Sequence, residues 1–252
     1  SSTKENNLEI SKLLKLNEVK VLNLKENVKA QIAIATGLSY LKEENYEGGV
    51  IVMDADGQDD PGHLVTIINE SKRNLDRTIV VMRTQREESF IFKIMYEIYL
   101  ILTLILTFRY MKFGVFSYIS HKSLGKVLST KDIYKAYAAS LAKHFKDKKK
   151  IYAARKKRIT GESQNNYVSL MHYALKIISV FKKQVLLNSI VFFIVAMVFY
   201  TFQIIPVYAI ISSTILILFN ILIFIISGKI SNSKKITDTL KNIKDLKILK
   251  RV

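Results

Sequence analysis

Two carboxylates, separated by one residue, follow a short apolar stretch that has the pattern of a strand. Gly49–Met53 is apolar and β-branched, and Asp54-Ala55-Asp56 comes directly after it. Alternate side chains of an extended chain point to the same side, so Asp54 and Asp56 can present their carboxylates together. Ligands bind at the carboxyl ends of strands in open α/β sheets. Paired carboxylates there suit Mg²⁺ or Mn²⁺, which also accept phosphate oxygens.

The residues after this pair make the pattern more specific. Gln58 offers a further carbonyl oxygen, and Asp59 and Asp60 precede Pro61, which is favoured at the start of a helix. An isolated Asp-x-Asp is more often a surface turn or a helix cap. The full order of strand, Asp-Ala-Asp-Gly-Gln-Asp-Asp-Pro and helix instead predicts a metal–diphosphate site.

The elements around this motif predict an α/β domain. Short apolar runs typical of strands alternate with helical patterns, and this alternation indicates a parallel or mixed sheet with covering helices. The expected strands are Val19–Leu24, Gly49–Met53 and Thr78–Met82, and the expected helices are Leu8–Leu16, Ala30–Glu43 and His63–Arg73.

A long apolar segment near the C-terminus predicts a membrane hairpin. Gln184 to Gly228 holds no charged residue, and Pro206 divides it into 185–205 and 207–227. At about 1.5 Å per residue, each half spans roughly 30 Å, the thickness of a bilayer core. A buried hairpin in a soluble core is the alternative. Lysines flank the hairpin and its turn has none, which predicts that 1–183 and 229–252 are cytoplasmic.

Two further segments are apolar or amphipathic, and the apolar run within the first, 98–108, is too short to span a bilayer. Residues 90–113 predict an interfacial helix lying on the membrane, with a buried core helix as the alternative. Residues 229–252 repeat apolar positions with lysines between them, which predicts a basic amphipathic helix. This tail can lie on an anionic leaflet, stay in solvent or form an oligomer contact.

The composition limits the partners. The chain of 252 residues carries 39 Lys and Arg against 21 Asp and Glu, a net charge of +18. This balance indicates an anionic partner such as nucleic acid, an acidic membrane or a phosphorylated substrate. No nucleic-acid module is recognisable, so we expect no nucleic acid as partner. The lack of cysteine excludes disulfides, zinc fingers, iron–sulfur clusters and a cysteine nucleophile.

In this order, the motifs resemble family 2 inverting glycosyltransferases with the GT-A fold. The chain is similar to the branch that holds dolichyl-phosphate mannose synthase-like and bacterial polyprenyl-phosphate glycosyltransferases. The family pattern Asp-Ala-Asp-x-Gln-Asp-x-Pro stands here at residues 54–61. Asn27 with the small-residue helix ending at Gly37-Leu38, the spaced arginines at 83–89 and the Gly161-Glu162-Ser163 run continue the similarity.

The resemblance implies a set of site residues. It implies that Asp54, Asp56 and Gln58 hold Mg²⁺ or Mn²⁺ on the diphosphate of a nucleotide-sugar, and that Asn27, Asp54 and Ala55 contact the nucleotide. Arginines can bind phosphate through two parallel hydrogen bonds. We therefore expect Arg86 and Arg158 to act at the acceptor phosphate or the diphosphate, supported by Arg83, Arg155 and Ser163. Plain surface arginines are the alternative.

The chain also departs from the family pattern. The family opens with a strand ending in Pro-x-Tyr-Asn-Glu and a second strand ending in Asp, and neither is found here. We therefore expect a GT-A domain that lacks its first strand and much of its base recognition. The Asp that some relatives carry within Gly-Asp-Phe is Val115 in this chain.

These observations predict a membrane-bound enzyme that moves a sugar from a nucleotide-sugar to a polyprenyl phosphate. A phosphate acceptor arrives ionised and needs no general base, because its second pKa is near 6. A glycolipid or growing glycan is the alternative acceptor, and a non-catalytic membrane scaffold is a third hypothesis. We expect four parts: the catalytic domain 1–165, a juxtamembrane helix 166–183, the hairpin 184–228 and the tail 229–252. Assembly into a homo-oligomer is possible.

Overall fold

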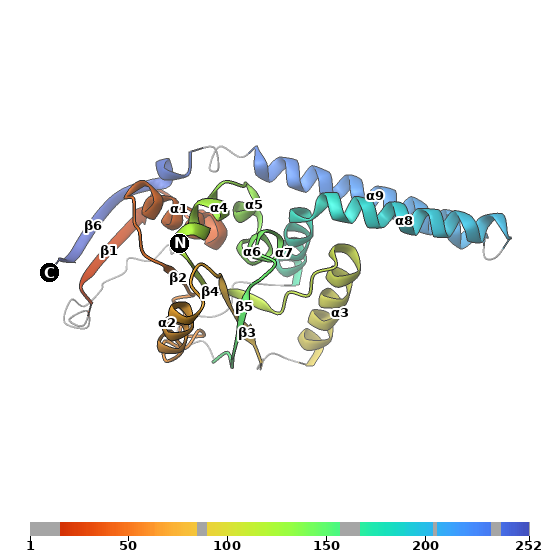
Figure 1. Ribbon diagram of the computed structural model, residues 1–252. Coiled ribbons are helices and arrows are strands. Elements are labelled where there is room, and N and C mark those ends of the chain that lie inside the picture. The colour runs from red at the N-terminus through yellow and green to blue at the C-terminus, as the bar shows by residue number, and fades with distance from the viewer. Residues whose placement is uncertain (1–15, 85–89, 157–166, 204–205, 233–237, 252) are drawn as a thin grey trace.

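The computed structural model describes residues 16–84, 90–156, 167–203, 206–232 and 238–251 (Figure 1). Its elements alternate between strands and helices before two long helices follow. They are β1 (Glu18–Leu24), α1 (Lys29–Glu43), β2 (Val50–Val52), α2 (His63–Arg73), β3 (Ile79–Arg83), α3 (Phe90–Thr107), β4 (Phe113–Ile119), α4 (His121–Leu128), α5 (Asp132–Lys135), α6 (Tyr137–His144), β5 (Lys149–Ala153), α7 (Tyr167–Val180), α8 (Lys182–Thr201), α9 (Pro206–Ser231), the 3-10 helix η2 (Thr239–Asn242) and β6 (Ile243–Arg251).

The main sheet has four strands in the order β2-β4-β3-β5. β4 is antiparallel to both β2 and β3, whereas β5 is parallel to β3. β2, β3 and β5 therefore point the same way, and their carboxyl ends share one edge of the sheet. This confirms the predicted mixed sheet and places the residues after those three strands together.

Side chains of β3 alternate between two hydrophobic layers, as a strand buried on both faces requires. Ile79 and Val81 pack with Ile67 of α2 on one face. Val80 and Met82 pack on the other face, in the larger core formed by α1 and α4 to α7. Helices thus cover both faces of the sheet. The observed α1 and α2 match the predicted helices 30–43 and 63–73 to within one residue.

β1 lies outside the main sheet and pairs with β6. The two strands form a separate antiparallel ribbon, in which the Asn23 side chain donates a 2.6 Å hydrogen bond to Asp245. The predicted helical tail is therefore wrong over residues 239–251, which form η2 and β6, whereas 229–231 are helical as the end of α9. Its apolar spacing fits a helix, but β1 offers a backbone edge, and a hydrogen-bonded ladder outweighs a weak local preference. Leu246 and Ile248 lie two apart on β6 and stay 39% and 45% exposed.

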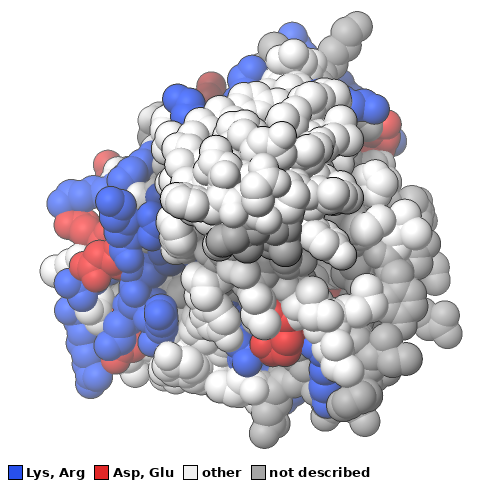
Figure 2. All heavy atoms as spheres, turned by 90° about the vertical axis from the view of Figure 1, so that its right-hand side faces the viewer, with Lys and Arg blue, Asp and Glu red and all other residues white. Residues whose placement is uncertain are grey.

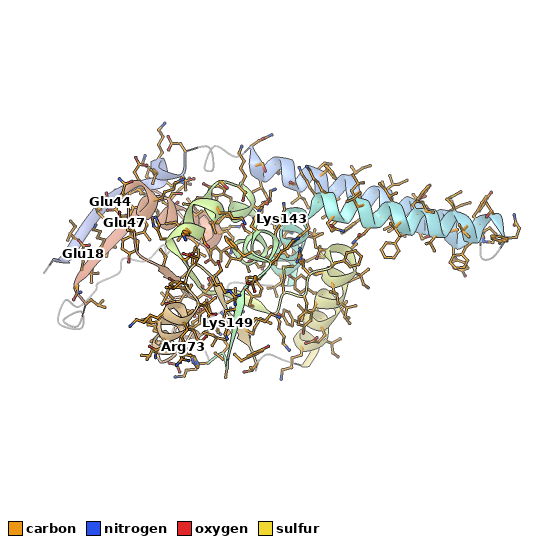
Figure 3. All side chains as sticks on the ribbon, viewed as in Figure 1. Glu18, Glu44, Glu47, Arg73, Lys143 and Lys149 are labelled. Atoms are coloured by element: carbon orange, nitrogen blue, oxygen red, sulfur yellow. The ribbon has the colours of Figure 1, made fainter. Side chains whose placement is uncertain are left out.

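α8 and α9 form the predicted hairpin, which projects away from the α/β domain (Figure 1). Both helices are long and apolar enough to cross a membrane by length and composition. Figure 3 shows side chains projecting from the hairpin all along its length. Buried polar groups join the two helices: Asn220 Nδ2 of α9 donates a 2.8 Å hydrogen bond to Ser189 Oγ of α8.

α3 packs on the base of this hairpin and runs roughly across its axis (Figure 1). Asn188 of α8 donates hydrogen bonds to the carbonyl oxygens of Ile105 (3.2 Å) and Leu106 (3.0 Å) in the last turn of α3. Helix ends leave such carbonyls without intrahelical partners. Asn188 therefore anchors the end of α3 to the hairpin.

The apolar outer side of α3 is uncovered. Its exposed large side chains are Ile94, Met95, Ile98, Ile101, Leu102, Leu104 and Ile105. The opposite side is buried, with Leu100 1% and Thr103 0% exposed. The helix is thus not the buried core helix considered as the alternative for residues 90–113.

A buried ionic cluster fixes α7, which leads into the hairpin. Asp132, 8% exposed, accepts hydrogen bonds from Lys135 (3.2 Å) and Lys143 (2.8 Å) and lies 3.0 Å from His144 Nε2. Lys143 also donates a 2.7 Å hydrogen bond to the carbonyl of Val180, at the end of α7. Figure 3 shows Lys143 beside the base of the hairpin. The cluster therefore sets the position of the hairpin relative to the sheet.

Candidate active site at the carboxyl edge of the sheet

The carboxyl ends of β2, β3 and β5 bring acidic and basic side chains to one place. Asp54 follows β2, Arg83 ends β3 and Arg155 follows β5. Backbone hydrogen bonds hold these segments in register: the Arg83 amide donates to the carbonyl of Lys112 (3.2 Å) and the Thr84 amide to that of Ala153 (3.0 Å). Residues that are far apart in the sequence, Asp54, Arg83 and Arg155, are therefore close together at one edge of the sheet.

The acidic loop after β2 is folded on its own side chains. Asp59, 6% exposed, accepts a 3.0 Å hydrogen bond from the Asp54 amide, and Asp56 accepts one of the same length from the Gln58 amide. Gly57 has φ 79°, a conformation that glycine adopts without strain. The loop thus turns sharply enough to bring Asp54, Asp56 and Asp59 close to one another.

A second segment, the one after β5, fastens this loop. Arg155 Nη2 donates to Asp54 Oδ2 at 3.3 Å, and Lys156 Nζ lies 2.7 Å from Asp60 Oδ2. The Lys156 amide also donates a 3.0 Å hydrogen bond to the Gln58 carbonyl. Three contacts from two neighbouring residues therefore fix the acidic loop against β5.

The charges in this cluster shift one another's protonation. Burial raises the pKa of Asp54, the carboxylates of Asp59 and Asp56 raise it further, and Arg155 and Arg83 oppose the rise. Burial likewise lowers the pKa of Arg155, with Arg83 adding to the effect and the three carboxylates opposing it. The cluster thus crowds carboxylates against one another and Arg83 against Arg155. A metal–diphosphate suits it, because the cation can neutralise the carboxylates and the phosphates can neutralise the arginines.

The donor set suits a hard divalent cation. Among the residues that the structure describes, no group of three or more His, Cys, Asp or Glu side chains could enclose a metal ion. Mg²⁺ needs only one or two protein carboxylates where substrate phosphates supply the other oxygens. Asp54 and Asp56 fit that requirement, since their crowding raises the pKa of Asp54 and a bound cation would relieve it.

Arg83 lies against the backbone of β4. A Cβ atom added at Gly114 would come within 2.2 Å of Arg83 Nη2 and 2.7 Å of its Cζ. Gly114 therefore gives the guanidinium its room. Neighbouring Val115 is 8% exposed and belongs to the larger hydrophobic core, so this position supplies no base.

Tyr173 of α7 is a residue that sequence reasoning missed. Its hydroxyl accepts a 3.4 Å hydrogen bond from Gln31 Nε2, and Gln31 Oε1 in turn accepts one of 2.6 Å from the Tyr137 amide. Burial raises the pKa of Tyr173 to about 12, while Arg83 lowers it and Asp54 raises it. The Tyr173 hydroxyl therefore lies close enough to the charged cluster to interact electrostatically with Arg83 and Asp54. No motif around position 173 indicated this.

The structure places the predicted site residues as follows. Asp54, Asp56 and Arg155 belong to one charged cluster with Arg83. Gln58 is half-buried in the same loop and Ala55 is exposed. Asn27 stands before α1, where its side chain accepts a 3.0 Å hydrogen bond from the Lys29 amide. Asp59, expected only as an acid near the start of a helix, is instead inside the cluster. Arg86, Arg158 and Ser163 lie outside the described residues.

Comparison with known proteins identifies the family. The profile described as "Glycosyl transferase family 2" matches residues 1–134, more than half of the chain. A search of curated proteins found no match. The matched range includes the acidic loop, β3 with Arg83, and β4 with Gly114. With its mixed sheet and its charged cluster at the carboxyl edge, the chain belongs to glycosyl transferase family 2.

Proposed function

We propose that this glycosyltransferase transfers a sugar, with inversion, from a nucleotide-diphosphate sugar to a polyprenyl phosphate at the cytoplasmic face of the cell membrane. A hexose-like sugar is the proposed cargo. The observation that carries the proposal is the charged cluster of Asp54, Asp56, Arg83 and Arg155, in a chain that also has an apolar hairpin.

The acidic loop supports a nucleotide-sugar donor. Asp54 and Asp56, with Gln58 as a further oxygen donor, would hold Mg²⁺ or Mn²⁺ against the diphosphate. When bound, the metal neutralises charge on the leaving nucleoside diphosphate. Asp59 keeps the loop in shape through the Asp54 amide. Asn27 and Ala55 remain the proposed nucleotide contacts.

The arginines support a reaction between two phosphorylated groups. Arg83 and Arg155 would lie along the diphosphate and stabilise the charge that develops as the bond to the sugar breaks. Arg155 is already oriented by Asp54, so little reorganisation is needed. Arg86, Arg158 and Ser163 remain proposed contacts of the acceptor phosphate or the diphosphate.

The nature of residue 115 favours a phosphate acceptor over a hydroxyl acceptor. A sugar hydroxyl needs a general base to remove its proton, and the buried Val115 provides none. A phosphate monoester is ionised near neutral pH, because its second pKa is close to 6. It can therefore attack the anomeric carbon without proton transfer to the protein. Transfer to a glycolipid or a growing glycan is the second candidate.

The arrangement of α3 and the hairpin supports a site beside the membrane. α3 lies across the hairpin axis with its apolar side exposed, as expected for a helix in the membrane surface plane (Figure 1). β3, which ends at Arg83, is the strand that precedes α3 along the chain. With both hairpin ends cytoplasmic, as flanking lysines favour, a lipid phosphate would be presented next to the charged cluster.

The experiment is sugar transfer by the full-length protein in detergent, with a short polyprenyl phosphate, several nucleotide-sugars and Mn²⁺. Asp56→Asn tests the metal–diphosphate loop, and Asp147→Asn is the matched control, because Asp147 is an exposed carboxylate paired with Arg77. We expect product that requires both Mn²⁺ and Asp56 and is unchanged in the control.

Other outcomes point elsewhere. If the protein binds a nucleotide-sugar but transfers nothing to polyprenyl phosphate, the acceptor is a glycolipid or a glycan. If it neither binds a donor nor forms product, the scaffold hypothesis replaces the proposal. Product that persists in Asp56→Asn would contradict the role given to the acidic loop.

A further inference from the structure

Five basic residues lie near the point where the hairpin leaves the α/β domain. We call Arg109, Lys131, Lys182, Lys183 and Lys229 the basic collar. Lys182 and Lys183 begin α8, and Lys229 lies in the last turn of α9. The collar thus includes both ends of the hairpin and reaches residues of the α/β domain.

Specific contacts place Lys131 and Lys182 at this level. Lys131 Nζ donates a 3.1 Å hydrogen bond to the carbonyl of Ser231, the last residue of α9. Lys182 Nζ lies 5.2 Å from the ring centre of Phe224, which joins the start of α8 to α9. Both lysines are therefore held at the hairpin base.

Arg109 reaches the same level through α3. It follows this helix by two residues, and the carbonyls of Ile105 and Leu106 in the last turn bind Asn188 of α8. Asn188 is six residues after Lys182, so α3 ends within about two helical turns of the collar lysine. Arg109 accordingly lies near the hairpin base.

Within the described ranges, none of the five collar residues forms an ion pair with a carboxylate. Asp132, the acidic neighbour of Lys131 in the chain, is buried and already binds Lys135, Lys143 and His144. Viewed along the hairpin, Lys and Arg side chains, with some Asp and Glu among them, gather along one side of the apolar projection (Figure 2). Positive charge thus adjoins the surface that would enter the bilayer.

We propose that the basic collar binds the phosphate groups of anionic phospholipids, such as phosphatidylglycerol, in the leaflet that the hairpin enters. The apolar hairpin below the collar would bring lipid phosphates to the same height as these cations. Lysine and arginine near an anionic leaflet are attracted by its surface potential. The acceptor lipid also carries a phosphate, but we assign the collar to phospholipid, because its residues lie at the base of the hairpin and not on the acidic loop. This inference rests on the membrane placement in the proposed function and not on the reaction.

The test measures lipid selectivity of the full chain in proteoliposomes. Spin-labelled phosphatidylglycerol and spin-labelled phosphatidylcholine are compared by the fraction of each that the protein immobilises. The collar variant carries Lys→Gln at Lys131, Lys182, Lys183 and Lys229. The matched control carries Lys→Gln at four exposed lysines of the opposite end, Lys25, Lys42, Lys244 and Lys247.

We expect the natural chain to prefer phosphatidylglycerol, and the collar variant to lose that preference by roughly tenfold or more, since each charge near an anionic surface contributes about fivefold. The control should keep the preference. A variant with Lys→Arg at the collar should restore it. High salt should weaken the selectivity of the natural chain, and this titration tests the proposal even if the Gln variant does not fold.

Three results would overturn the inference. They are equal affinity of the natural chain for the two lipids, a loss of selectivity in the control as large as in the collar variant, and displacement of spin-labelled phosphatidylglycerol only by a polyprenyl phosphate. Asp56→Asn should leave lipid selectivity unchanged, so failure of the collar proposal and failure of the catalytic proposal give different results.

Discussion

Gly114→Ala is a small change that tests whether the position of Arg83 matters for the reaction. The new Cβ would come within 2.2 Å of Arg83 Nη2, whereas non-bonded atoms normally lie about 3.5 Å apart. The guanidinium must therefore move by roughly 1 Å. Gly114 does not have a positive φ, so alanine adds no backbone strain.

The expected cost appears in activity rather than in stability. The clashing atoms are the far end of a flexible side chain, which can move without disturbing the core. If Arg83 donates a charge-assisted hydrogen bond to the diphosphate, its loss costs about 1.5–3 kcal/mol. That corresponds to a roughly 10- to 150-fold decrease in kcat/KM for sugar transfer. The dissociation constant of the nucleoside diphosphate, measured by calorimetry, should rise in the same variant.

Gly125→Ala is the control for this prediction. Apart from the neighbouring backbone of α4 itself, no atom lies within 4 Å of a Cβ at Gly125, which is in the middle of that helix. Alanine there should stabilise the helix by about 1 kcal/mol and leave activity unchanged. If Gly114→Ala keeps full activity and donor affinity while remaining folded, Arg83 does not act at the diphosphate and the reasoning is refuted.

Three further predictions concern the buried ionic cluster of Asp132, the contact of α3 with the hairpin, and Tyr173 beside the charged cluster. Asp132→Asn should lower the free energy of unfolding by about 3–5 kcal/mol, because it leaves the buried Lys135 without its carboxylate. Burial opposes ionisation of Asp132, but hydrogen bonds from Lys143 and His144 outweigh it and lower its pKa. Its stabilisation is therefore complete above about pH 4 and is lost as the pH falls through the lowered pKa; acid titrations of Asp132→Asn should lack this step. Asn188→Leu should increase hydrogen exchange at the end of α3, since two carbonyl acceptors lose their donor, and unchanged exchange would show that packing alone holds α3. Tyr173→Phe should raise KM more than it lowers kcat, and the exposed Tyr152→Phe is its control. Equal kinetics in the two variants would show that Tyr173 is not part of the site.

Local patterns in the sequence predict much of this fold, because the apolar spacing of a helix or strand depends only on the residues of that element. The helices α1 and α2 match their expected ranges, since each has an apolar face with helical spacing and a clear end. Asp54 and Asp56 lie near Arg83 and Arg155 because parallel strands must end at one edge of the sheet. The direction of the strands therefore predicts which residues meet at the candidate site.

Local patterns do not predict contacts between segments that are distant in the sequence. The place of Tyr173 depends on how α7 packs on α1, and no local spacing encodes that. β6 has a helical apolar period, yet it is a strand because β1 offers it a ladder of hydrogen bonds. Asp59 looked like a favourable charge before α2, but the turn at Gly57 folds it back onto the Asp54 amide.

The pairing of β1 with β6 has a consequence for synthesis of the chain. Asn23 and Asp245, which are bonded across this ribbon, lie 222 residues apart. At a translation rate of about 5–20 residues per second, β1 waits roughly 10–45 s for its partner. During that time its open edge is a template for pairing with other chains. In a membrane-spanning hairpin, β6 returns to β1 only after α8 and α9 have both crossed. A chain in which only one of the two helices crossed would keep β6 on the other side of the membrane and leave the edge of β1 unpaired.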